Sequence, residues 1–217
     1  MILKFAYHCL YYSHMPSRNI LKDNVPESYY HVYARGVSKR QIFLDSRDYA
    51  YLEKLFARYL SVNPTQSKEG LAYPHYHGVV DLLAYCLMGN HFHLLIYQKE
   101  QDMMSKLMRS ILTSYSRYFN LRHKRSGPLF ESRYKAARVD QKSYLQHISR
   151  YIHLNPRYWK RYQHSSLKFY RQAPPEWLTP ASVLELFTSS EDYMTFLEDY
   201  EEHKAMLDEV KQSLVQL

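Results

Sequence analysis

Two histidines, His91 and His93, stand on either side of one phenylalanine and precede an aliphatic run, Leu94 to Ile96. A β-strand projects residues i and i+2 from the same face, so both imidazoles would leave one side of a rigid element. Imidazole is a common ligand of divalent metals, and two imidazoles form half of a metal site. The spacing therefore predicts a metal-binding strand.

A second pair with the same spacing, His75 and His77, provides an internal comparison. Pro74 precedes this pair and Gly78 follows it, with no aliphatic run afterwards. This arrangement of Pro and Gly predicts a loop, which does not hold two side chains in parallel. We therefore predict that only the pair before the aliphatic run binds a metal.

The composition limits the class of protein. A chain of 217 residues suffices for one well-packed core with a small appendage. No apolar stretch reaches the roughly 18 residues of a membrane helix, and residues 1–10 lack the pattern of a signal peptide. The two cysteines, Cys9 and Cys86, form no CxxC pair, which disfavours both a disulfide framework and a thiolate zinc site. These features predict a protein of the reducing cytoplasm.

Basic residues are concentrated in one part of the chain. The net charge is +8, but residues 181–217 contain nine acids against two lysines, so residues 1–180 carry +15. Between Gln101 and Arg171, sixteen Lys or Arg stand against three acids, with aromatic residues interleaved. A positive field beside side chains that can stack suits a nucleic acid. The simpler alternative is a solvated basic surface.

Periodicity predicts the elements that would position these residues. The predicted strands are 29–35, 79–87, 91–97 and 128–139, and the predicted helices are 45–62, 103–123 and 141–155. Asp45 or Ser46 would cap the first helix and Asp140 the third, which Pro156 would end. Their order predicts an α+β fold, the ferredoxin-like split βαβ with a four-stranded antiparallel sheet. In that topology the strand of His91 is central and one face of the sheet is free.

The helix predicted over 141–155 carries a polar face. On a helical wheel, Tyr144, His147, Tyr151 and Asn155 fall within about 60° of one another. Tyr151 and Asn155 are four residues apart and are therefore neighbours on the surface. A tyrosine can be a nucleophile that forms a covalent intermediate, and an amide oxygen can complete a metal shell. Considered alone, however, Tyr151 is one of 23 tyrosines, and packing is the commoner role.

Five short sequences distinguish between these interpretations of Tyr151. They are YHVYARG at 30–36, AYCLMGNHFHLL at 84–95, YFN at 118–120, GPLF at 127–130 and RYIHLNP at 150–156. With these sequences in this order and spacing, the chain resembles REP-associated tyrosine transposases, a branch of the single-tyrosine HUH transposases. The resemblance covers about residues 28 to 170.

The resemblance implies roles for individual residues. His91 and His93 would bind Mg²⁺ or Mn²⁺, with Asn155 as a further metal ligand, and Tyr151 would be the nucleophile. Tyr144 is the rival nucleophile on the same helix face, but no motif surrounds it. The implied reaction is nicking and strand transfer of single-stranded DNA at hairpins formed by repeated palindromes. Tyr151 would become joined to the 5′-phosphate, and a 3′-hydroxyl would be released.

The resemblance also directs attention to the basic residues. We predict that seven of them contact the DNA backbone, namely Arg117, Arg122, Lys124, Arg125, Arg133, Lys135 and Arg138. The predicted location is the bacterial cytoplasm, at the nucleoid when DNA is bound, and the protein would be a monomer or a homodimer. Two alternatives remain open, a hairpin-binding regulator that no longer cuts and a sheet-based RNA-binding module.

The sequence divides into three predicted parts. Residues 1–27 form a flexible leader, 28–172 the catalytic domain and 173–217 an acidic helical extension. The extension would pack on the core, bind a partner or cover the basic groove. After Pro156 the chain departs from the family pattern, and His164 stands where the family has a tryptophan. This departure leaves open how the helix of Tyr151 is anchored.

Overall fold

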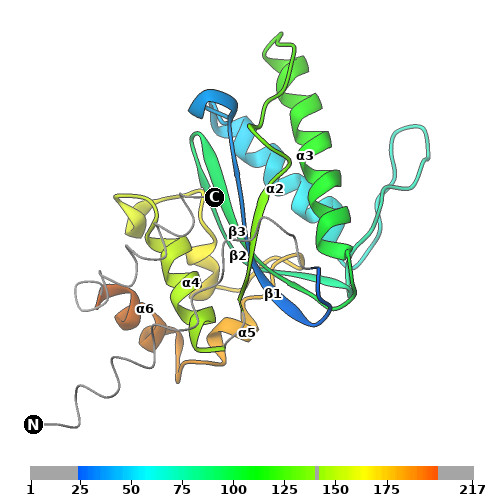
Figure 1. Ribbon diagram of the computed structural model, residues 1–217. Coiled ribbons are helices and arrows are strands. Elements are labelled where there is room, and N and C mark those ends of the chain that lie inside the picture. The colour runs from blue at the N-terminus through cyan, green and yellow to red at the C-terminus, as the bar shows by residue number, and fades with distance from the viewer. Residues whose placement is uncertain (1–23, 140–141, 200–217) are drawn as a thin grey trace, which may run out of the picture.

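The structure is a computed structural model, and it describes residues 24–139 and 142–199 (Figure 1). Its elements are β1 (Ser28–Arg35), η2 (Val37–Lys39), α2 (Ser46–Leu60), β2 (Val80–Met88), β3 (His91–Gln98), α3 (Met103–Arg122), β4 (Lys135–Val139), α4 (Lys142–Leu154), η3 (Trp159–Arg161), η4 (Ser166–Tyr170), α5 (Ala181–Leu184) and α6 (Ser190–Glu198). The strands form an antiparallel sheet in the order β2-β3-β1-β4. This order confirms the predicted split βαβ fold, with β3 at the centre.

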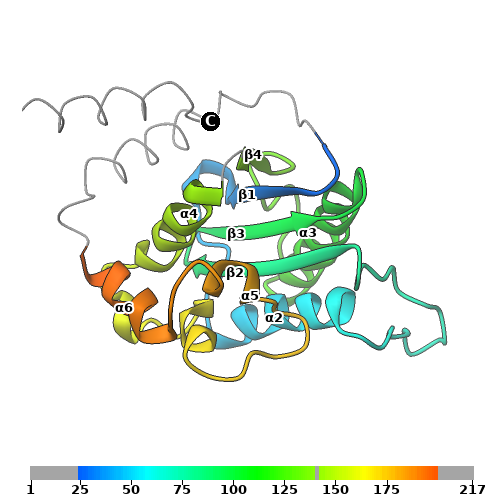
Figure 2. The same ribbon diagram turned by 90° about the horizontal axis from the view of Figure 1, so that it is seen from below.

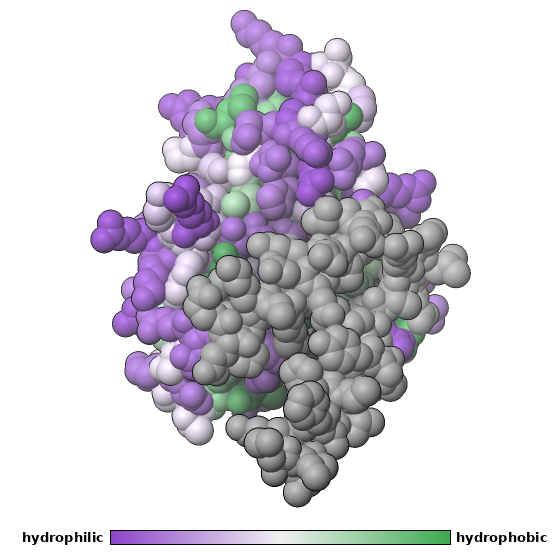
Figure 3. Space-filling model, turned by 60° about the vertical axis from the view of Figure 1, so that its left-hand side comes forward, coloured by the Kyte–Doolittle hydropathy of each residue, from purple (hydrophilic) through white to green (hydrophobic). Residues whose placement is uncertain are grey.

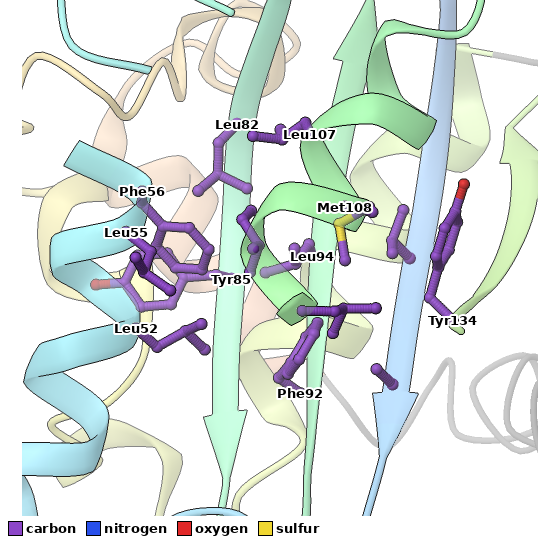
Figure 4. Close-up of a cluster of buried hydrophobic side chains, with 14 of the residues drawn as sticks. Leu52, Leu55, Phe56, Leu82, Tyr85, Phe92, Leu94, Leu107, Met108 and Tyr134 are labelled. Atoms are coloured by element: carbon purple, nitrogen blue, oxygen red, sulfur yellow. The ribbon is translucent and has the colours of Figure 1, made fainter. Parts of the chain in front are cut away.

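Helices α2 and α3 cover one face of the sheet with an apolar core. Alternate residues of β3, such as Phe92 and Leu94, point toward these helices and meet Leu55 of α2 and Met108 of α3 (Figure 4). One face of α3 is buried, at Met104, Leu107, Met108, Ile111, Leu112, Tyr115 and Phe119. The two methionines of this face therefore pack in the core.

Polar side chains fix where α2 begins and how it meets α3. Asp45 is the N-cap of α2, and its carboxylate accepts from the backbone N–H of Arg47 at 3.0 Å. Asp48, in the first turn, is fully buried and pairs with Arg122 at 2.6 Å and with His123 at 3.0 Å. The two helices are thus joined at the end of α3 as well as through their apolar faces.

The second face of the sheet is covered as well, so the prediction of a free face was wrong. Helix α4 packs on β2 and β3, and α5 and α6 pack against α4 (Figures 1 and 2). The physical reason is that this face is apolar along much of its length. Leu95 of β3 belongs to a second buried cluster together with Ile148 and Ile152 of α4. The same cluster contains Val183 and Tyr193 from the extension.

The His153 ring anchors α4 to the rest of the molecule. Its Nδ1 lies 2.6 Å from the Tyr193 hydroxyl of α6, and its Nε2 lies 2.8 Å from the Ser166 Oγ. Ser166 in turn accepts from the backbone N–H of Tyr85 at 2.8 Å, on β2. His164, at the position of the family tryptophan, stacks on Tyr49 with ring centroids 3.6 Å apart. These contacts anchor α4, although the chain after Pro156 departs from the family pattern.

The fourth strand is shorter than predicted. The sequence pattern predicts a strand over 128–139, but β4 covers only Lys135–Val139. Residues 131–133 are polar and exposed, and the chain bends there instead of continuing as a strand. The preceding segment stays beside the end of β1 through a single bridge between Gly36 and Phe130. Alternation thus correctly located the edge strand but overestimated its length.

Several predictions fall partly outside the described residues. The proposed cap Asp140, most of the leader and residues 200–217 of the acidic extension lie there. Within the described part, Asn24 donates to Asp102 at 2.8 Å and the Val25 carbonyl accepts from Gln98 at 2.8 Å, so this end of the leader contacts the core. None of the helices described in 24–139 and 142–199 has the length and apolar character of a membrane span.

Candidate active site

His91 and His93 project from β3 toward α4, opposite to the face on which Phe92 is buried. Their ring centroids are 5.0 Å apart, with the planes nearly perpendicular. His93 is buried at 2% exposure, whereas His91, beside the hairpin turn, is half-buried. The strand therefore holds both imidazoles on one face, as their spacing predicts.

Helix α4 brings Tyr151 against this pair. The Tyr151 ring centroid is 5.3 Å from that of His93, and the two rings meet edge to face. Asn155 directly follows α4, and its side chain lies close enough to Tyr151 and His91 to shift the pKa of both. Tyr144 is buried seven residues earlier on α4, which places its Cα about 10 Å further along the helix axis. The structure thus brings together Tyr151, Asn155 and the two histidines.

The first strand adds three residues to the site that the sequence analysis did not identify. His31, Tyr33 and Arg35 alternate along β1 on the face of the histidine pair, because the register places Tyr33 opposite His93 and Arg35 opposite His91. The His31 Nε2 lies 2.9 Å from the His93 Nδ1. The Arg35 guanidinium lies 5.2 Å from the centre of the Tyr33 ring. Alternation within YHVYARG, combined with this register, would have identified them.

Burial sets the protonation states in the site. It lowers the pKa of His91 to about 4, an effect that nearby Arg35 reinforces and Asn155 opposes. Burial also holds the pKa of His93 well below the usual value. Both imidazoles are therefore neutral near pH 7, which is the form that binds a metal. Burial raises the pKa of the Tyr151 phenol to about 12, while Asn155 and Arg35 act in the opposite direction.

The residues present fit a divalent cation with open coordination positions. His91 and His93 on β3 would supply two neutral imidazoles, and Asn155, the residue directly after α4, would supply an amide oxygen. In residues 24–139 and 142–199, no group of three or more His, Cys, Asp or Glu side chains could hold a metal. A bound ion would therefore depend on the amide and on substrate or water for its remaining ligands.

The other histidine pair has a different role. His75 and His77 lie in the loop between α2 and β2, which projects from the body of the molecule (Figure 1). The His75 Nε2 is 2.7 Å from the Ser61 carbonyl oxygen, and the His77 Nδ1 is 3.0 Å from that of Leu60. Both rings thus bind carbonyls at the C-terminal end of α2, a common use of histidine there.

The seven basic residues predicted to contact DNA differ in their surroundings. Arg117, Lys124 and Arg133 are exposed. In the view of Figure 3, hydrophilic residues predominate on the part of the surface that is coloured by hydropathy. Arg122 donates to Asp45 and Asp48, both at 2.6 Å. The remaining three are Arg125, which donates to Asn120 at 3.0 Å, and the β4 residues Lys135 and Arg138. Most of the Arg122 donors are thus used within the chain.

A groove of about 1000 Å³ lies between α3 and the segment 127–134. Its lining includes three cations, Lys106, Arg109 and Arg133, and one acid, Asp102. Of these three cations, only Arg133 is among the residues predicted from the sequence to contact DNA. The far side of the same segment meets the active-site strand, because the Glu131 N–H donates to the Arg35 carbonyl at 2.9 Å. The groove and the active site therefore lie on either side of one short segment.

Comparison with known proteins agrees with this arrangement. A sequence model of the family described as "Transposase IS200 like" matches residues 24–155. The chain is also similar to a solved structure of the REP-associated tyrosine transposase bound to a REP hairpin, with a TM-score of 0.51 and 12% identity over 73% of this chain and 90% of that chain. At this identity the similarity establishes the fold. The search of curated proteins gave no match.

The match to the family model spans more than half of the chain and includes all the elements from β1 to α4. It contains the histidine pair, Tyr151 and Asn155. The resemblance noted in the sequence is thus confirmed at the level of family and fold. The chain belongs to the IS200-like transposase family.

Proposed function

We propose that the protein is a metal-dependent enzyme that nicks single-stranded DNA at hairpins and transfers the cut strand through a covalent tyrosine intermediate. The observation that carries the proposal is the position of Tyr151. Its ring lies 5.3 Å from that of His93, and Asn155 is close enough to shift the pKa of both Tyr151 and His91. A side chain that can attack phosphorus thus lies beside side chains that can bind a metal.

The reaction can be followed from the residues of the chain. A divalent ion on His91, His93 and Asn155 would polarise the scissile phosphate. The Tyr151 Oη attacks phosphorus and loses its proton, the bond from phosphorus to the 3′-oxygen breaks, and that oxygen leaves as a hydroxyl. Arg35, close enough to lower the pKa of Tyr151, would stabilise the phenolate and the developing phosphate charge. Attack of a 3′-hydroxyl on the phosphotyrosine rejoins a strand and restores Tyr151.

The groove beside α3 supports a path for the DNA backbone. Arg109 and Arg133 face this groove, and Lys135 on β4 pairs with Tyr33 on the active-site face of the sheet. Cations thus extend from the groove around the edge of β4 toward the histidine pair. We propose that the strand leaving the scissile phosphate follows them, held through its phosphates.

Covalent capture tests the proposal. Labelled DNA hairpins from the repeats that flank the gene would be incubated with the protein and Mn²⁺ or Mg²⁺, then separated on a denaturing gel. We expect a protein–DNA band with the wild type and with Tyr144→Phe, and no band with Tyr151→Phe or after addition of EDTA. Tyr144→Phe is the matched control, since it removes a buried hydroxyl from the same helix.

Two outcomes would contradict the proposal. Tight hairpin binding without a covalent band in either metal would favour a regulator of the same fold that does not cut. Equal binding of RNA hairpins, with no requirement for metal, would favour an RNA-binding module.

A further inference from the structure

The His31 side chain lies beneath the histidine pair and has no role in the reaction described above. It is 1% exposed, at the middle of β1, and its ring stacks on that of His93 with centroids 5.0 Å apart. The Tyr151 ring meets it edge to face at 5.7 Å. His31 therefore contacts both a metal ligand and the nucleophile from below.

The short contact between the two rings constrains their protons. The His31 Nε2 and the His93 Nδ1 are 2.9 Å apart, so one nitrogen donates and the other accepts. If His31 donates, the proton of His93 is on Nε2, and neither of its nitrogens is free for a metal. If His93 donates, its Nε2 keeps a lone pair that can coordinate.

We propose that His31 is a positioning residue that accepts a hydrogen bond from His93 Nδ1 and thereby keeps the Nε2 of His93 free to bind the metal. This inference rests on the proposed function, because it concerns the same metal site. A hydrogen bond from the second nitrogen of a ligand histidine commonly fixes its tautomer and orientation. Here the acceptor is a second imidazole.

Two observations distinguish this role from the alternatives. First, His31 is not a third histidine ligand of the metal, because the described residues contain no group of three or more His, Cys, Asp or Glu side chains that could hold a metal ion. Nor is it placed to stabilise the fold, because its other nitrogen, Nδ1, is buried and has no hydrogen-bond partner among the described residues. An unpaired buried polar atom destabilises a folded protein. An apolar residue at this position would avoid that cost.

The proton positions can be measured in the metal-free protein. Nitrogen-15 chemical shifts of the histidine rings near pH 7 report which nitrogen carries the proton. We expect His93 to be protonated on Nδ1 and His31 on Nδ1, with both Nε2 atoms unprotonated. A proton on the Nε2 of His93 would overturn the proposal, and this measurement needs neither a variant nor a bound metal.

Two substitutions then test the consequence for metal binding. His31→Leu removes the acceptor, and we expect Mn²⁺ to bind about 10- to 100-fold more weakly by calorimetry, with a midpoint of thermal unfolding that is not lowered. His31→Gln restores an acceptor and should retain affinity within a few-fold of wild type. Unchanged Mn²⁺ affinity in His31→Leu would overturn the proposal, as would a loss in His31→Gln equal to that in His31→Leu.

The design separates this inference from the proposed function. If the wild type binds no Mn²⁺ but His93 carries its proton on Nδ1, the metal site fails while the hydrogen bond between the two rings stands. His153→Leu serves as a control for the loss of a buried imidazole. It should lower the midpoint of unfolding and leave Mn²⁺ affinity unchanged, since His153 bonds to Tyr193 and Ser166 instead.

Discussion

The two faces of the sheet bury different kinds of side chain. Under α2 and α3 the sheet presents apolar residues such as Phe92, Leu94 and Ile96. Under α4 it presents His31 and His93 as well as apolar residues. Most of the buried polar side chains in the described part lie on this second side, at His31, His93, Ser149, Arg150, His153, Ser165 and Ser166. One face thus buries mainly apolar side chains, whereas the other buries most of the polar ones as well.

The second face itself contains two kinds of buried histidine. Both nitrogens of His153 have partners, in Tyr193 and Ser166, and this ring joins α4 to its neighbours. His31 has a partner for Nε2 only, in His93. A satisfied buried imidazole contributes to the fold, whereas an incompletely satisfied one destabilises it and calls for a functional explanation.

Acid should affect the second face most strongly. Burial lowers the pKa of His31 and of His153 to about 3. The pKa of His91 is lowered to about 4, mainly by burial and to a smaller extent by the positive charge of Arg35. In the unfolded chain these groups bind a proton near pH 6.5, so stability should fall as the pH drops from 6.5 toward 4. Each histidine contributes about 1.4 kcal/mol per pH unit. Urea unfolding between pH 7 and 5 measures this slope, and a flat profile would contradict it.

A truncation on the apolar face should be the next largest effect. Leu94→Ala removes a fully buried side chain under α2 and α3 and should lower the free energy of unfolding by about 2–5 kcal/mol. Chemical denaturation at pH 7 measures the change. Leu121→Ala is the matched control, because Leu121 is 81% exposed and its truncation should be nearly neutral. A cost below about 1 kcal/mol at Leu94 would mean that this face is not the main source of stability.

His153→Leu should show that the satisfied histidine supports the fold. The substitution leaves the buried hydroxyls of Tyr193 and Ser166 without one partner each, at a cost of about 1–3 kcal/mol near pH 7. It should also reduce the dependence of stability on pH, since one buried imidazole is removed. Denaturation at pH 7 and pH 5 tests both expectations. If the variant were as stable as the wild type at pH 7, His153 would not stabilise the fold, and it would not differ from His31 in this respect.

The smallest effect concerns the groove on the side of α3. Arg133→Gln should weaken hairpin binding modestly and reduce the slope of log affinity against log salt by about one. Fluorescence anisotropy at several salt concentrations measures this slope. Lys68→Gln, in the projecting loop, removes the same charge and should leave the slope unchanged. If the two substitutions had equal effects, the overall positive charge of the protein would explain DNA binding, and no phosphate contact at the groove would be needed.

Local patterns sufficed to predict much of the fold and part of the candidate site. The strand of His91 and His93, the helix of Tyr151 and the cap at Asp45 follow from alternation, periodicity and side-chain chemistry over a few residues. The chain order of these elements then gave the sheet topology. Edge features were less accurate, as the shortened β4 shows, because local alternation does not reveal where a strand loses its partner.

The sequence by itself determined which residues share a face, since that depends only on the geometry of one strand or one helix. Only the tertiary structure decided which faces meet. The register between β1 and β3 places His31, Tyr33 and Arg35 beside a histidine pair some sixty residues away. The packing of α4 across the second face brings Tyr151 to the same point and closes a surface that the strand pattern alone left open. Such pairings depend on the balance of burial and hydrogen bonding over the whole chain, which no local segment contains.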